Sequence, residues 1–180
     1  MSAVPGKPPA VKMPPQVETP LDLLLEQLGQ LLTVEETLAK LVLPSLAREI
    51  SDDELKQAVQ EHLEETRTHA GNVKQAFLAL GFPPTGKPAL GFDGLRSEHE
   101  SKAPKVSSAL RSGVHCAAAM GTEHYEINAY EAALRLADAL GAGEVSSLLR
   151  TNLDQEVAAL SKLGEQAERL ARLAVDEPTI

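Results

Sequence analysis

The sequence predicts an all-α fold, an antiparallel bundle of four long helices in which one connection is a long crossover. Apolar residues recur at intervals of three and four over four stretches of the 180-residue chain, which is the helical period. Aromatic residues make up only 3% of the chain, and strand proteins usually contain more aromatic and β-branched side chains. A segment at 81–104 with four prolines and four glycines separates two helical hairpins.

The bundle is predicted to occupy 20–175 as a single domain, because a chain of this length can enclose one core. Residues 1–19 are polar and rich in proline, a composition typical of a disordered tail, with a docking segment as the alternative. Residues 176–180 are expected to form a flexible C-terminus.

The first helix is predicted to run from Pro20 to about Ile50. Thr19 is a good N-cap, and proline suits the first helical position. Pro44 lies inside the pattern, where the missing N–H is expected to kink or locally loosen the helix. The apolar stripe of this helix consists of Leu24, Leu28, Leu31, Leu38 and Val42.

The other three helices have their own start and stop signals. Ser51 and Glu54 predict a capping box for the second helix, which ends near Leu80 before a glycine. The crossover is expected to carry a short helix near 94–101 and to let the second and third helices run in the same direction. The third helix is predicted at about 105–140, and the fourth at about 144–174 after a glycine-containing turn.

Charge and composition disfavour several functional classes. The formal net charge of −9 argues against general binding to nucleic acids or to anionic membranes, since both need basic surfaces. The sequence shows neither a signal peptide nor an apolar run long enough to span a bilayer, so a cytoplasmic protein is expected. Cys116 is the single cysteine, and we interpret it as a small core residue rather than a catalytic one.

Glutamates interrupt the apolar stripes. Glu156 replaces an apolar residue between Leu153 and Leu160, and Glu123 shares a line with Glu126, Tyr130 and several alanines. An unpaired carboxylate in an apolar core costs several kcal/mol unless a partner compensates it. The alternative for Glu156 is a position at the edge of the stripe, paired to Arg or Lys. The alternative for Glu123 is an exposed position beside a core tyrosine.

The second predicted helix adds a carboxylate and imidazoles on one face. Glu65 and His69 are four residues apart, so both can bind one metal ion, and His62 lies on the same face one turn earlier. Di-iron bundles usually place a histidine three residues after the glutamate. Here the residue three after Glu65 is Thr68. The alternative for either histidine is a hydrogen-bonded core residue.

The glutamates lie at matching heights in the predicted bundle. Glu36 precedes Ser51 by 15 residues and Glu65 follows it by 14, which puts both roughly 21–23 Å from that turn. Glu126 and Glu156 lie similarly far from the turn near Ala142. Four carboxylates at one level predict a shared cation site, with two metals the favoured arrangement. Counting alone leaves Glu35 and Glu36 open, since neighbours point about 100° apart.

At these residues the chain resembles the bacterial ferritin-like stress proteins typified by YciF and YciE, over roughly 20–175. The resemblance implies a ferritin-like four-helix bundle, often dimeric, with a dinuclear metal centre. It also shows a departure, since Leu160 stands where relatives often have an acidic residue. The resemblance is carried by His62–Thr66, Glu123–Ile127 with Tyr130, Glu36 to Pro44, Gly94-Leu95 with Glu98, and Leu148-Leu149, Thr151–Leu153, Glu156 and Lys162-Leu163.

The expected function is that of a dinuclear iron or manganese protein that oxidises iron or handles peroxide. Dioxygen or peroxide are the expected substrates, and a homodimer is implied by the resemblance alone. The alternative is a non-enzymatic helical stress or interaction protein with a degenerate or empty site. The predicted metal ligands are Glu36, Glu65, His69, Glu123, Glu126 and Glu156.

Overall fold

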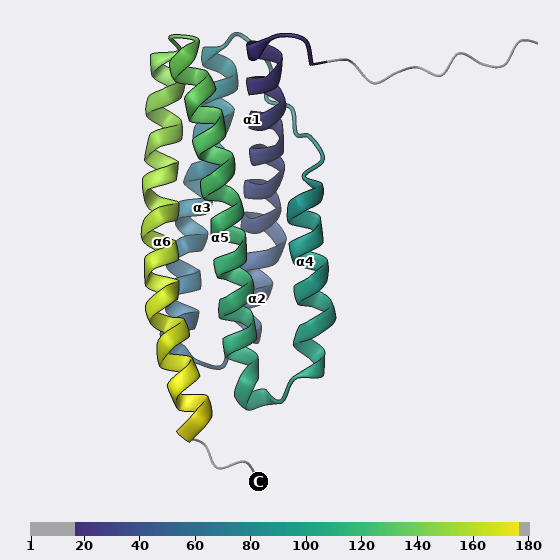
Figure 1. The fold of residues 1–180 in the computed structure, drawn as a ribbon, viewed down its shortest axis with the longest axis vertical. Coiled ribbons are helices and arrows are strands. Elements are labelled where there is room, and N and C mark those ends of the chain that lie inside the picture. Colours follow the sequence, from purple (N-terminus) through teal and green to yellow (C-terminus); the bar gives the residue numbers. More distant parts are fainter. Residues whose placement is uncertain (1–16, 177–180) are drawn as a thin grey trace, which may run out of the picture.

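The computed structural model describes residues 17–176 and forms a bundle of four long helices (Figure 1). The long helices are α1 (Pro20–Thr37) continued by α2 (Leu43–Glu49), α3 (Asp53–Ala79), α5 (Ser108–Ala139) and α6 (Gly143–Asp176). Both α1 and α6 pack on α3 and on α5, and each of these neighbouring pairs runs antiparallel. No strand occurs in this part of the chain, so the all-α prediction is confirmed.

The helix ends follow local chemistry. Thr19 and Asp22 form a capping box at the start of α1. At the start of α3, however, the cap is Asp52 rather than the expected Ser51, because the Asp52 carboxylate accepts the Leu55 N–H at 2.9 Å. After α3 and α5 the chain reverses at glycines with φ of 81° and 70° (Gly81 and Gly141), as predicted.

Pro44 coincides with the predicted loosening of the first helix. Between α1 and α2 the chain forms a π-helical turn (Leu38–Val42), in which the Leu43 N–H donates to the carbonyl of Leu38. Proline cannot donate a backbone hydrogen bond, and its ring crowds the preceding turn, so the wider π turn accommodates it. The helix therefore continues in one direction across the proline.

The crossover passes along α1 before α4 (Leu90–Lys102) runs down the side of α5. The Lys87 N–H donates to the Gly29 carbonyl at 2.8 Å, which ties the crossover to the middle of α1. Helix α4 is longer than the expected segment at 94–101 and is followed by a 3₁₀ turn (Ala103–Lys105). Buried Phe92 attaches α4 to the bundle.

Two apolar clusters fill the bundle, one toward each end. The first surrounds Leu24, Leu28 and Phe77, and the second surrounds Leu38, Leu55 and Phe92. The buried glutamates lie where the two clusters meet. Most of the tail predicted at 1–19, and all but one residue of the C-terminus predicted at 176–180, lie outside the described residues. No described helix is both long enough and apolar enough to cross a membrane.

Candidate metal centre

Six buried acidic and histidine side chains gather halfway along the bundle. Each of the four long helices supplies at least one of them, because each helix carries a polar residue in its inward apolar stripe at this level. They are Glu35 from α1, His62 and His69 from α3, Glu123 and Glu126 from α5, and Glu156 from α6.

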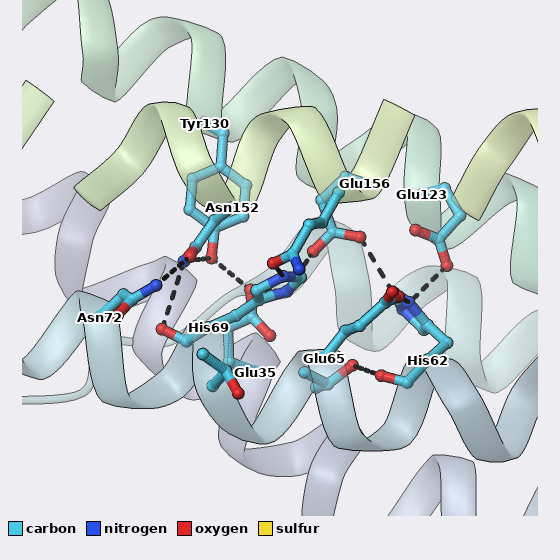
Figure 2. A network of polar contacts seen from close by, with 12 residues as sticks. Glu35, His62, Glu65, His69, Asn72, Glu123, Tyr130, Asn152 and Glu156 are labelled. Atoms are coloured by element: carbon cyan, nitrogen blue, oxygen red, sulfur yellow. Dashed lines mark hydrogen bonds and ion pairs between the residues drawn. The ribbon is translucent and has the colours of Figure 1, made fainter. Parts of the chain in front are cut away.

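The first group of possible ligands contains Glu35, His69 and Glu156, whose ligand atoms lie within 4.8 Å of one another. His69 Nδ1 is 2.8 Å from Glu156 Oε1 and 3.7 Å from Glu35 Oε1. Figure 2 shows the three side chains converging from three helices.

A second group contains His62, Glu123 and again Glu156. His62 Nε2 is 3.3 Å from Glu123 Oε1 and 3.8 Å from Glu156 Oε2 (Figure 2). The two oxygens of Glu156 thus approach different groups, and each group has one histidine and one glutamate of its own. This is the arrangement that a bridging carboxylate between two cations requires.

Several of these buried oxygens have no hydrogen-bond partner among the described residues. Both oxygens of Glu126 and of Glu156 lack one, as does one oxygen each of Glu35 and Glu123. Buried polar atoms are nearly always paired, so such a concentration indicates a missing partner. His69 Nδ1 and Glu156 Oε1 are close but not aligned for a hydrogen bond. Two metal-ligating atoms that face a common cation have this kind of geometry.

Burial and mutual repulsion oppose ionisation of these carboxyls. Burial, followed by the charge of Glu156, raises the pKa of Glu35 to about 8 and that of Glu126 well above its usual value. Burial and the contact with Glu156 also raise the pKa of Glu123 strongly. Within the described chain, Glu35, Glu123 and Glu156 form ion pairs with the two histidines alone, and Glu126 forms none. A bound cation would supply the absent positive charge.

The pKa shifts of His69 and Glu156 both favour the charged form of the side chain. Burial by itself would lower the pKa of His69, but the contact with Glu156 and the charges of Glu35 and Glu156 raise it to about 9. Burial opposes the charge of Glu156 as well, yet its contacts with His69 and Glu123 lower its pKa. Metal binding at this position would have to replace the proton of His69.

A hydrogen-bond network holds the first group in place (Figure 2). The Tyr130 hydroxyl donates to Glu35, and Asn152 Nδ2 donates to the Tyr130 oxygen at 2.9 Å and to the His69 carbonyl at 3.2 Å. Asn72 in turn donates to Asn152 at 2.7 Å. The sequence had placed Tyr130 on one helical line with Glu123 and Glu126. Asn152 was missed, although it lies one turn before Glu156 on the same helical face.

The structure corrects the choice of glutamate in α1. Glu36 lies at the surface, where it forms ion pairs with Lys40 at 2.8 Å and Lys74 at 2.6 Å. Glu35 is fully buried instead, because it continues the inward stripe of Leu31 at the next helical turn. The distance of each glutamate from the turn does not separate buried Glu35 from Glu36 at the surface. Their rotational positions around the helix axis do.

The remaining predicted residues divide between the centre and its edge. His69, Glu123, Glu126 and Glu156 are brought together, although Glu126 belongs to neither group of three. The Glu65 side chain is 31% exposed, and its Oε2 lies 3.4 Å from Nδ1 of His62. Glu65 therefore lies at the rim of the centre, where it orients His62. The His62 side chain occupies the inner position that was expected of Glu65.

The donor set fits a pair of first-row divalent metals. Carboxylate and imidazole ligands from facing helices are typical of dinuclear iron and manganese sites in four-helix bundles. Leu160, at the position where the resemblance led us to expect an acidic residue, supplies no ligand. The two histidine-containing groups nevertheless provide three donors each.

Comparison with known proteins gives a consistent result. Residues 19–176 match the family described as a domain of unknown function, DUF892. Protein YciF of Escherichia coli strain K12 is 30% identical over 148 residues, which cover 81% of this chain and 89% of YciF.

Solved structures of related proteins share the fold. The crystal structure of the Escherichia coli stress protein YciF superposes with a TM-score of 0.80 at 28% identity, covering 86% of this chain and 98% of that one. YcfI of Rhodopseudomonas palustris superposes with a TM-score of 0.80 at 32% identity, covering 82% of this chain and 94% of that one. A structural role has been ascribed to YcfI. A Xanthomonas campestris protein at 22% identity gives 0.70 over 88% and 97%, and shows the fold alone.

Proposed function

The chain belongs to the DUF892 family and is related to the stress protein YciF, and on that premise we propose that it is a ferritin-like dinuclear metal protein. Iron and manganese are the proposed metals, and oxidation of iron or removal of peroxide is the proposed activity. The observation that carries this proposal is the pair of ligand groups that share Glu156.

Each residue has a distinct part in holding the metals. Glu35 and His69 would bind one ion, Glu123 and His62 would bind the other, and Glu156 would bridge them. Glu126 lies close enough for its charge to act on Glu35, Glu123 and Glu156, so its unpaired carboxylate would complete the charge balance. Four carboxylates and two neutral imidazoles match two divalent cations in charge.

A bound pair of Fe²⁺ ions would supply two electrons, enough to reduce O₂ to H₂O₂ with two protons or H₂O₂ to two waters with two protons. The protein's own residues would position the reactants and exclude bulk water. Tyr130 and Asn152 hold Glu35 and the backbone at His69 in place, so the first group is preorganised before the metal binds.

The test is metal binding by two matched variants, Glu156→Gln and Glu36→Gln. Protein purified without a chelator is loaded anaerobically with Fe²⁺ or Mn²⁺, and the bound metal is measured. We expect about two ions per chain for the wild type and for Glu36→Gln, since Glu36 lies outside the centre. Glu156→Gln loses the bridge and should bind at most one ion weakly.

Oxidation of the loaded protein completes the test. Addition of O₂ or H₂O₂ to the ferrous protein should produce ferric absorption in the wild type and in Glu36→Gln only. Circular dichroism confirms that the variants keep their helices. Equal metal binding by Glu156→Gln and the wild type would overturn the proposal. A wild type that binds neither metal would favour the non-enzymatic alternative.

A further inference from the structure

A small cavity adjoins the His62 side of the centre. Its volume is about 40 Å³, and His62 and Glu123 lie at its inner end. Most of its remaining lining is apolar and comes from the π-helical turn, α2, α4 and α5, with Leu38, Leu43 and Phe92 as examples. The proposed metal pair is therefore reached by an apolar space on this side.

The size and polarity of the cavity limit what it can hold. A water molecule occupies about 30 Å³ in the liquid, so a space of about 40 Å³ suits a single molecule of one or two heavy atoms. Apolar cavities exclude water and instead take up gases such as xenon. Eight of the thirteen residues that line this cavity are apolar and suit a small apolar gas. The other five are polar or charged: His62, Arg96, His99, Thr122 and Glu123.

On its outer side the cavity approaches a groove between α2 and α4. The groove has a volume of about 490 Å³, and it includes polar residues such as Glu49 and Glu100. Val42, Leu46, Arg96 and His99 line both the groove and the cavity, so these four side chains form the partition between them. Figure 1 shows α4 beside α2 at this part of the bundle.

The π-helical turn contributes to this arrangement. Leu38 and Val42 are its first and last residues, and both line the cavity. π turns inside α-helices are often found at functional sites. The sequence feature that produces it, Pro44, is thereby connected to the space beside the centre.

We propose that this cavity admits dioxygen from the α2–α4 groove and holds it next to His62 and Glu123. The inference rests on the proposed function for the use of dioxygen, whereas the cavity itself is independent of any metal. The four shared side chains, two apolar and two polar, act as the partition that dioxygen passes, and the apolar residues behind them line most of the cavity.

The experiment compares Ala119→Leu with Ala132→Leu, two partly buried alanines of α5. Ala119 lines the cavity and Ala132 does not. Xenon NMR on the metal-free protein reports occupancy of the cavity without any redox chemistry. We expect xenon binding in the wild type and in Ala132→Leu, and its loss in Ala119→Leu.

The rate of oxidation by O₂ provides the second measurement. With the ferrous protein at limiting O₂, Ala119→Leu should oxidise about tenfold more slowly, while metal stoichiometry stays that of the wild type. Leu46→Ala, which shortens a partition residue, should oxidise faster. This second variant keeps the test decisive if Ala119→Leu fails to fold.

Three results would overturn the inference: no xenon binding in the wild type, an unchanged O₂ rate in the folded Ala119→Leu, or an equal slowing of oxidation by H₂O₂. The last would show a path that is not selective for an apolar gas. Failure of the proposed function is recognised separately, because it appears as absence of metal in the wild type.

Discussion

Glu126 illustrates, at the scale of a single residue, the conflict between the stability of the fold and the proposed metal binding. Its carboxyl is fully buried and neither oxygen has a hydrogen-bond partner among the described residues. Burial and the nearby charge of Glu156 raise its pKa well above the usual value. Such a group destabilises the metal-free fold, so its position is explained only if a ligand compensates it.

We therefore predict that Glu126→Met stabilises the metal-free protein. Methionine has a similar size and leaves no unpaired polar atom, so the free energy of unfolding should increase by about 1–3 kcal/mol. Urea unfolding in the presence of a chelator measures the change. The same variant should gain less stability than the wild type when Mn²⁺ is added. A decrease in metal-free stability would contradict this account.

At the scale of elements, the start of α3 combines a cap with an inter-helix contact. The Asp52 carboxylate accepts a hydrogen bond from the Leu55 N–H. It also accepts hydrogen bonds from both terminal nitrogens of Arg169 in α6. The bidentate pair fixes the end of α6 against the turn between α2 and α3. One side chain thus serves helix initiation and tertiary packing together.

We predict that Asp52→Asn lowers the free energy of unfolding at pH 7 by about 0.5–1.5 kcal/mol. Asparagine keeps the cap but loses the charged pair. The hydrogen bonds from Arg169 lower the pKa of Asp52 below its ordinary value of 3.8. The contribution of the pair is therefore complete above that ordinary value and disappears as the pH falls through the lowered pKa.

Urea unfolding of both proteins at decreasing pH checks this second prediction. The difference between wild type and Asp52→Asn should be constant from pH 7 to about pH 5 and should shrink below about pH 4. A difference that stays constant down to low pH would show that the charge of Asp52 does not contribute. Asp52→Ala, which also removes the cap, should be the less stable variant throughout.

At the scale of the whole molecule, the crossover determines which helices face each other. It returns the chain along α1 so that α5 runs parallel to α3, and the hairpin of α5 and α6 then completes the bundle (Figure 1). Close packing against α1 makes this path specific. A Cβ on Gly29 would clash with Lys87 Cγ and would lie 2.8 Å from the Thr85 carbonyl oxygen.

We predict opposite effects of alanine at two helical glycines. Gly29→Ala should destabilise the protein by about 1–3 kcal/mol, because the backbone at Thr85 must move. Gly71→Ala is the matched control, since a Cβ there meets nothing within 4 Å. It should stabilise the protein by about 0.5–1 kcal/mol through helix propensity. Thermal unfolding measures both, and equal effects would contradict the close approach.

The sequence by itself determined the helices and most of their ends. Repeating apolar positions, Thr19 with Pro20, and the glycines after α3 and α5 act within a few residues, so local patterns suffice to predict them. The same patterns indicated that polar residues interrupt the inward stripes at one level. The metal ligands themselves remain a prediction that metal binding must test.

Tertiary structure alone decided which side chains meet. Glu35 rather than Glu36 faces inward because one residue along a helix rotates the side chain by about 100°, an angle that a count of residues to a turn does not contain. The contact between Tyr130 and Glu35, and that between Asn152 and the His69 carbonyl, join residues far apart in sequence. Such contacts depend on the packing of all four helices, which no local pattern specifies.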